Sequence, residues 1–131
     1  MTTIFSKIVK GEIPSYKIAE DEKYFAFLDI NPLAKGHTLV IPKKETDYIF
    51  DLSEEEYAGL MVFSRRIAHA VFKAVPCKRI GVAVIGLEVP HAHVHLVPLN
   101  KMSDINFSSP KLTLPEKVME ETCQAIRKHL M

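Results

Sequence analysis

Short apolar stretches bounded by polar or turn-forming residues predict five β-strands along the chain. They cover residues 16–20, 24–29, 37–42, 79–85 and 91–99. The polar segment 21–23 is typical of a hairpin connection between the first two strands, and Pro42 marks the end of the third. A tight stretch around Gly86 separates the last two strands. Hairpin connections of this kind favour antiparallel pairing.

Helical periodicity marks three other segments of the chain. Residues 4–10 form a short amphipathic pattern. Ser53 and Glu56 have the spacing of a capping box, in which each side chain accepts a hydrogen bond from the other residue's backbone. Apolar positions then recur every three or four residues, at Leu60, Phe63, Ile67 and Val71. This helix is expected to end at Pro76, and a last helix begins near Thr113 and runs to the C-terminus.

The order of these elements predicts an α+β fold with a mostly antiparallel five-stranded sheet. One long helix, expected between residues 53 and 76, crosses from the third strand to the fourth, and a C-terminal helix follows the last strand. No repeat, low-complexity tract or linker divides the chain. Residues 1–131 are therefore expected to form a single domain.

Composition and charge exclude several classes of protein. The chain has 131 residues, of which 47% are hydrophobic and 25% charged, as in an average soluble domain. A formal net charge of +1 argues against a basic surface for nucleic acid. The sequence contains neither an apolar run of about 18 residues that would span a membrane nor a secretory leader pattern. A cytoplasmic protein that does not bind membranes is therefore expected.

Three of the six histidines, His91, His93 and His95, alternate with apolar residues in the last predicted strand. Side chains two apart share one face of a strand, so the imidazoles are expected in a row, with neighbours about 7 Å apart. Such a row suits an extended anion such as a phosphate chain. Two alternatives are half-exposed polar residues of an ordinary strand, and a His-x-His metal site with Glu88 and His37 as further ligands.

The segment 91–97 resembles the signature of the histidine triad (HIT) superfamily, in which three histidines alternate with apolar residues. Further segments are similar to the nucleoside phosphoramidase and hydrolase branch of that superfamily: 4–9 with 12–14, 25–32, and 36–43. The resemblance covers residues 3–100 in order. Residues 101–131 match less clearly and are expected to be a C-terminal extension with a helix.

The resemblance implies that His93 attacks the α-phosphorus of a nucleotide and forms a covalent nucleotidyl-histidine, which water then hydrolyses. A neutral imidazole suits this role because its ordinary pKa is about 6.5. His95 and His37 are implied to hydrogen-bond the phosphate oxygens, and His91 to orient the others. In-line displacement at phosphorus depends on positioning and charge stabilisation, so neither a metal nor another cofactor is expected.

The resemblance also implies a nucleoside pocket. Asp29 is implied to accept hydrogen bonds from both ribose hydroxyls. Six apolar residues are implied to enclose the base, namely Phe5, Ile8, Ile13, Phe27, Ile30 and Leu39. The alternatives are ordinary core packing for these six residues and a turn-forming role for Asp29 ahead of Asn31 and Pro32. The expected ligand is a purine nucleotide, and a homodimer is expected.

Three features of this chain depart from the family pattern. Many relatives carry a Cys-x-x-Cys that forms part of a structural zinc site, whereas this chain has Thr3 and Ser6, so that site is expected to be absent. Glu88 stands where well-studied members have a serine or threonine that helps protonate the leaving group. A carboxylic acid serves there only if its pKa is raised. The segment 81–86 is short and lacks the asparagine and Gly-rich loop that contact phosphate.

The leading hypothesis is a nucleotide hydrolase or nucleotidyl transferase acting on a phosphoramidate, an acyl-adenylate or a dinucleoside polyphosphate. One alternative is a purine nucleotide-binding or adaptor protein with weak catalysis, which the presence of Glu88 and the short segment 81–86 would explain. A further alternative is a metal-dependent enzyme that uses the His-x-His ligands.

Overall fold

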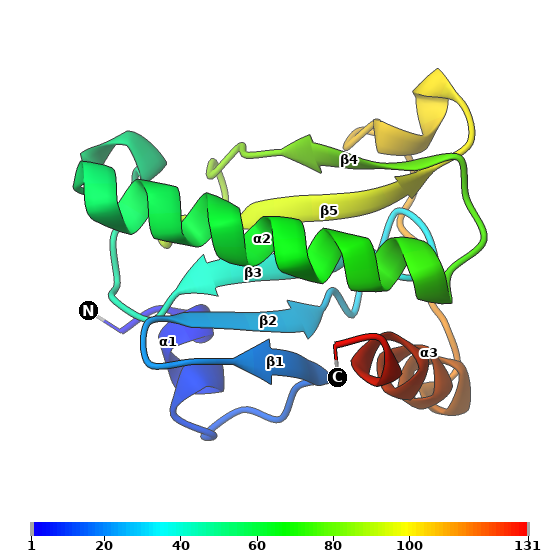
Figure 1. Ribbon diagram of the computed structural model, residues 1–131, viewed down its shortest axis with the longest axis horizontal. Helices are drawn as coiled ribbons and strands as arrows, with labels where there is room; N and C mark the ends of the chain where they lie inside the picture. Colours follow the sequence, from blue (N-terminus) through cyan, green and yellow to red (C-terminus); the bar gives the residue numbers. More distant parts are fainter. Residues whose placement is uncertain (1, 131) are drawn as a thin grey trace.

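A single five-stranded sheet forms the centre of the computed structural model, which describes residues 2–130 (Figure 1). The strand order is β1-β2-β3-β5-β4, and all neighbouring strands are antiparallel. The strands are β1 (Lys17–Glu20), β2 (Tyr24–Leu28), β3 (Thr38–Pro42), β4 (Arg79–Ala83) and β5 (Val94–Leu99). The predicted α+β class with a mostly antiparallel sheet is confirmed.

Three α-helices and two short 3₁₀-helices accompany the sheet. They are α1 (Ile4–Val9), η1 (Ile49–Asp51), α2 (Glu54–Ala74), η2 (Met102–Ile105) and α3 (Glu116–Lys128). The capping box of Ser53 and Glu56 is present and begins α2, as predicted. Helix α2 connects β3 to β4 and crosses β5, which lies between them, so the crossover helix is confirmed. Among residues 2–130, no helix combines the length and apolar character needed to cross a membrane.

Two predicted strands are shorter in the structure. Strand β4 ends at Ala83 instead of residue 85, and β5 begins at Val94 instead of residue 91. The last cross-strand pair on this side joins Ala83 to His95, so residues 91–93 lie beyond the ladder. Their backbone bonds elsewhere: His91 N–H donates to the Val89 carbonyl, and Ala92 N–H donates to the Thr46 carbonyl. Apolar alternation therefore predicted the face of these residues but not where the strand begins.

Each face of the sheet carries its own apolar cluster. Val40, Val94 and Leu96 belong to the larger cluster, which includes buried residues of α2 and α3. Leu39 and Ile41 alternate with these positions and belong to a smaller cluster with Phe5 of α1. Helices α2 and α3 thus cover one face, and α1 lies against the other (Figure 1). His95 lies between Val94 and Leu96 in β5, so its side chain points toward the α1 face.

Gly36 shapes the turn that leads into β3. Its φ of +93° lies in the left-handed region, and a Cβ there would come within 2.8 Å of Val75 Cγ2. We predict that Gly36→Ala lowers the free energy of unfolding by roughly 2–4 kcal/mol, because backbone strain and overpacking act together. Urea unfolding measures the loss.

Gly11 provides a matched control for that substitution. Its φ of +80° is similar, but no heavy atom lies within 4 Å of a Cβ built there. Gly11→Ala should therefore lose only the backbone part, about 1–2 kcal/mol. An equal loss in the two variants would show that close packing against Val75 adds nothing.

Candidate active site

Four histidines gather on the α1 face of the sheet. His37 immediately precedes β3, His91 and His93 lie on the segment that leads into β5, and His95 is in β5. Their exposed fractions are 1%, 0%, 7% and 8% in that order. The structure thus brings together all four of the histidines that the sequence analysis selected. Full burial also excludes the alternative that they are half-exposed residues of an ordinary strand.

The predicted ring spacing is wrong. The ring centroids of His93 and His95 are 4.8 Å apart instead of about 7 Å. Those of His37 and His95, which lie on neighbouring strand segments, are 5.2 Å apart. The prediction assumed extended strand geometry from residue 91 onward, whereas the strand begins at Val94. The imidazoles therefore form a compact cluster.

Hydrogen bonds fix the protons of His37 and His95. The backbone N–H of Leu33 donates to His37 Nδ1 at 2.9 Å, so Nδ1 must be an acceptor. The remaining ring nitrogen of His37, Nε2, then carries the proton and donates it to His95 Nδ1 at 3.0 Å. In a neutral ring, His95 consequently carries its own proton on Nε2. This nitrogen is a hydrogen-bond donor for a ligand oxygen.

Burial keeps these two rings neutral. Desolvation lowers the pKa of His37 to about 4, and the charges of Lys111 and His93 act in the same direction. Desolvation also lowers the pKa of His95 to about 3, with smaller contributions from His93 and His37. Both rings are therefore neutral donors near pH 7.

His93 is held in the opposite tautomer. Its Nδ1 lies 2.8 Å from the carbonyl oxygen of His91. A carbonyl only accepts hydrogen bonds, so Nδ1 carries the proton and Nε2 keeps a free electron pair. The Phe5 ring packs edge-on against His93 with centroids 5.0 Å apart, which limits rotation of the imidazole. The arrangement presents one nucleophilic nitrogen in a fixed direction.

Asp29 follows β2 and lies beside His37. Its Oδ2 is 3.7 Å from His37 Nε2, while Oδ1 accepts a hydrogen bond from the backbone N–H of Asn31 at 2.9 Å. Burial raises the pKa of Asp29, and the Asn31 hydrogen bond opposes that shift. The residue thus forms a local turn, as the alternative interpretation required, and also places a carboxylate oxygen near the histidines.

The six predicted base-enclosing residues separate into two groups. Phe5, Phe27 and Leu39 are buried together, and Ile8 packs against that cluster. Ile13 is half-buried, and Ile30 is 64% exposed just beyond Asp29. The structure therefore brings four of the six into one apolar cluster beside the histidines, while Ile30 is open to solvent.

Glu88 lies in the exposed turn that precedes the triad. Within residues 2–130 its side chain takes part in no hydrogen bond or ion pair with other protein groups. Its neighbour Val89 packs against the smaller apolar cluster. The structure places Glu88 close to the triad in the chain but does not bond it to any histidine.

Two residues of the site were missed in the sequence analysis. The Phe107 ring lies against His95, with ring centroids 4.7 Å apart, and edge-on to His37 at 6.2 Å. Lys111 donates from Nζ to the Phe107 carbonyl at 2.7 Å. The backbone N–H of Leu112 donates to the Pro32 carbonyl at 2.8 Å, which holds this segment over the site. No local pattern marks these residues.

A metal ion has one candidate set of ligands among the described residues. One ligand atom from each of Asp29, His37 and His95 lies within 4.8 Å of the others. Glu88, which the metal hypothesis included, is not in this group. The proton on His37 Nε2 already occupies the space between the two rings, and Leu33 N–H fixes that tautomer. A metal would have to displace this proton, so the observed hydrogen bonds favour a hydrogen-bonded pair of neutral rings.

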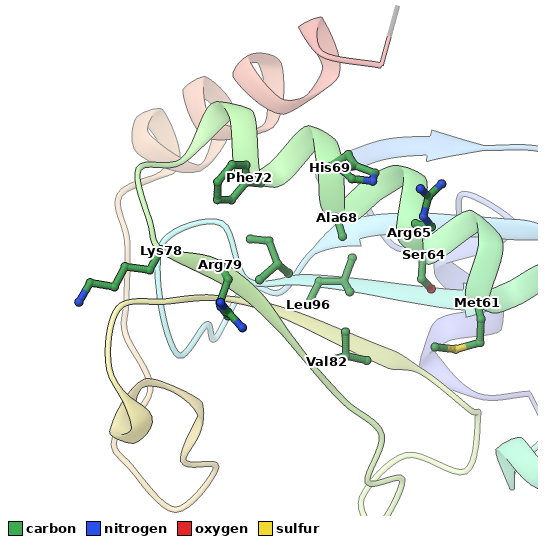
Figure 2. A pocket seen from close by; sticks show the side chains of 11 residues that line it. Met61, Ser64, Arg65, Ala68, His69, Phe72, Lys78, Arg79, Val82 and Leu96 are labelled. Atoms are coloured by element: carbon green, nitrogen blue, oxygen red, sulfur yellow. The ribbon is translucent and has the colours of Figure 1, made fainter.

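A hollow in the described surface lies away from the histidines. It is a groove of ≈ 620 Å³ between α2 and β4, on the sheet face that carries Leu96 (Figure 2). Its lining includes Met61, Ala68, Phe72 and Val82. The groove contains none of the triad histidines, and its lining is mainly apolar. The chemistry of the buried imidazoles, not the size of this groove, identifies the candidate active site.

Comparison with known proteins identifies a family to which this chain is similar. A family model described as HIT domain matches residues 10–102. The chain is 34% identical over 131 residues to an uncharacterized HIT-like protein of Borreliella burgdorferi, with 94% of each chain covered. It is 38% identical over 96 residues to adenosine 5'-monophosphoramidase HNT1 of Saccharomyces cerevisiae, covering 72% of this chain and 61% of that protein.

A solved structure of a HIT-like protein is also similar to this chain. The crystal structure of a HIT-like protein from Bartonella henselae, described as involved in cell-cycle regulation, matches with a TM-score of 0.85 and 34% identity. The match covers 98% of this chain and 96% of that one. The antiparallel sheet and its buried histidines define a histidine triad protein. The chain belongs to the HIT domain family.

The buried histidines predict a specific loss of stability in acid. Histidines in the unfolded chain have a pKa of about 6.5, so below this pH the unfolded state binds more protons than the folded state. The free energy of unfolding should therefore be highest above pH 6.5. It should fall by roughly 2–4 kcal/mol as the pH drops toward 4.

Urea unfolding at several pH values measures this dependence. His37→Gln should flatten the slope between pH 6.5 and 4, because one buried group no longer titrates. The control is His69→Gln, since His69 is exposed on α2 and has no contact with the triad. A slope that is the same in His37→Gln and in the parent protein would contradict the assignment.

Proposed function

We propose that this protein is a nucleotide hydrolase or nucleotidyl transferase that cleaves purine nucleotide conjugates at the α-phosphate through a covalent intermediate on His93. The observation that supports this most directly is the 2.8 Å hydrogen bond from His93 Nδ1 to the His91 carbonyl. It leaves the electron pair of Nε2 free for attack. The name of the yeast relative, an adenosine 5'-monophosphoramidase, supports a phosphoramidate as one substrate.

The proposed reaction has two displacements at phosphorus. In the first, His93 Nε2 bonds to the α-phosphorus, and the bond to the leaving group breaks with its electron pair on that group. The imidazole then carries phosphorus on Nε2 and a proton on Nδ1, so it is cationic, and the His91 carbonyl stabilises this charge. In the second, water attacks phosphorus and releases a proton to solvent, the electron pair of the phosphorus–nitrogen bond returns to Nε2, and a nucleoside monophosphate is released.

The neighbouring groups supply binding and charge stabilisation. We assign His95 Nε2–H as a donor to a phosphate oxygen, with His37 fixing its tautomer through the 3.0 Å hydrogen bond. Asp29 is assigned to the ribose hydroxyls, because a carboxylate accepts two hydrogen bonds. The apolar cluster of Phe5, Phe27 and Leu39 is assigned to the base. None of these roles requires a metal or another cofactor.

Glu88 is the proposed source of the proton for the leaving group. It is the sole acidic residue between Glu56 and Asp104 in the sequence. Its exposed turn precedes the triad, so a proton donor there can exchange with solvent. The role requires the carboxyl group of Glu88 to be protonated, and no hydrogen bond within residues 2–130 ties Glu88 to the histidines.

Replacement of His93 tests the proposed function. In a panel of adenylated substrates, the parent protein should release AMP and form an acid-labile nucleotidyl adduct visible by intact-protein mass spectrometry. His93→Ala should lower AMP release by at least about 10³-fold, because no other group replaces the nucleophile. His69→Ala serves as the control. Full activity of His93→Ala would contradict the mechanism.

The same panel separates the alternatives. Tight binding of AMP without turnover in the parent protein would favour a nucleotide-binding or adaptor protein. Activity that is lost in chelator together with a stoichiometric metal would favour the metal-dependent enzyme, with Asp29, His37 and His95 as the ligands.

We also propose a homodimer that forms through β4 and the adjacent side of α2. Strand β4 is at the edge of the sheet, so one side of its backbone is open to pairing. Exposed apolar side chains follow this edge, including Val62 and Phe72 of α2 and Val82 of β4. Pairing of β4 with its symmetry copy would continue the sheet and cover these side chains.

A charge placed on this edge tests the dimer. Val82→Glu should shift the molar mass in light scattering toward that of one chain, because a dimer would bury the new carboxylate. The control is Ile4→Glu, since Ile4 is exposed on α1, against the other sheet face. A parent protein that already has the mass of one chain would contradict the proposed dimer.

A further inference from the structure

A polar cluster, buried except for the exposed Glu45, links helix α1 to the first triad histidine. It consists of Thr3, Ser6, Glu45 and His91, and we name it the α1 polar cluster. Thr3 Oγ1 lies 2.8 Å from His91 Nδ1. Glu45 Oε1 accepts from the backbone N–H of Thr3 at 2.8 Å and from the Ser6 hydroxyl at 2.7 Å. The cluster therefore joins three segments that are far apart in the sequence.

The shorter hydrogen bonds assign the protons in this cluster, since Thr3 Oγ1 lies 2.8 Å from His91 Nδ1 and 3.3 Å from Ser6 Oγ. His91 Nε2 lies 2.7 Å from the Pro42 carbonyl, which only accepts, so Nε2 carries the proton. Burial lowers the pKa of His91, which keeps the ring neutral and leaves Nδ1 as an acceptor. The Thr3 hydroxyl therefore donates to Nδ1. Both nitrogens of a fully buried ring are thus paired, and the ring has one tautomer and one orientation.

The same residue holds the nucleophile. The His91 carbonyl accepts the Nδ1 proton of His93 at 2.8 Å. Residues 91–93 lie outside the β-ladder, so strand pairing does not fix this carbonyl. Instead, the ring of His91 is held by Thr3 and Pro42, and the next backbone N–H, of Ala92, donates to the Thr46 carbonyl at 2.7 Å. Thr46 follows Glu45 in the chain, so the segment that holds the Ala92 backbone also contacts Thr3 and Ser6.

We propose that Thr3, Ser6 and Glu45 are positioning residues for the reaction. They hold His91 in one tautomer and orientation, and the His91 carbonyl thereby aims the nucleophilic nitrogen of His93 at phosphorus. The kinetic part of this inference rests on the proposed function, in which His93 Nε2 attacks the α-phosphorus. The structural part, the tautomer of His91, does not.

Thr3 also stabilises helix α1, and this role must be separated from its proposed role in positioning His91. Thr3 is the N-cap of α1, because its hydroxyl accepts from the Ser6 backbone N–H at 3.0 Å. Loss of a cap lowers stability whatever the cap touches. Ser53 provides the matched control, since it caps α2 in the same manner and has no hydrogen bond to the triad. Ser53→Ala should lower the unfolding temperature and leave kcat unchanged.

The experiment compares Thr3→Val, Thr3→Ser and Ser53→Ala. Thr3→Val keeps the shape of the side chain but removes the hydroxyl, so kcat should fall about 10–100-fold with KM changed less than about 3-fold. Thr3→Ser restores the donor and should keep kcat within about 3-fold of the parent. In nuclear magnetic resonance of protein with ¹⁵N-labelled histidine, His91 should show one neutral Nε2–H tautomer. Thr3→Val should shift the ¹⁵N resonance of His91 Nδ1, because that nitrogen loses its hydrogen-bond donor while Pro42 still holds the proton on Nε2.

Two results would overturn the proposal. One is a Thr3→Val protein with the parent kcat and the parent ¹⁵N resonance of His91 Nδ1. The other is an equal fall of kcat in Ser53→Ala, which would show that loss of any cap has this effect. If the parent protein forms no adduct on His93, the proposed function fails, but the ¹⁵N measurement still decides whether Thr3 donates to His91.

Discussion

Burial of four imidazoles is the constraint on which the rest of the site depends. A buried polar nitrogen without a partner is costly, so each ring nitrogen must be paired or directed toward a ligand. Within residues 2–130, no buried side-chain nitrogen or oxygen lacks a hydrogen-bond partner. Backbone groups of Leu33, Pro42 and His91 provide much of this pairing. The backbone therefore decides where the protons of the site reside.

The fold could be predicted from local signals where those signals determine the element. The capping box and the regular apolar spacing predicted α2 within two residues of its observed ends. Apolar alternation predicted the five strands but not all of their limits, since a strand ends where its partner ends. Strand β5 begins at Val94, which pairs with Val40 of β3 and lies one residue beyond the last pair with β4, Ala83 to His95. The start of β5 therefore depends on strand pairing and cannot be derived from the local sequence.

The candidate site could likewise be predicted only in part, because some of its geometry depends on contacts between distant segments. The triad has a local pattern, and the resemblance to the HIT superfamily added His37 and Asp29. The distances between the rings depend on the irregular backbone at residues 91–93, which alternation does not reveal. Phe107 and Glu45 reach the site from segments remote in sequence, and neither belongs to a motif. Such contacts follow from tertiary packing alone.

The register between β3 and β5 has a consequence for selectivity. Leu39 lies directly opposite His95, so a residue of the proposed base pocket and a proposed phosphate donor are cross-strand partners. Partners in an antiparallel sheet are held about 5 Å apart, and neither can shift without breaking the ladder. In the proposed function, this pairing would fix the distance between the base and the α-phosphate. The proposed enzyme would then select the nucleotide that it holds and place no such restriction on the group that it releases.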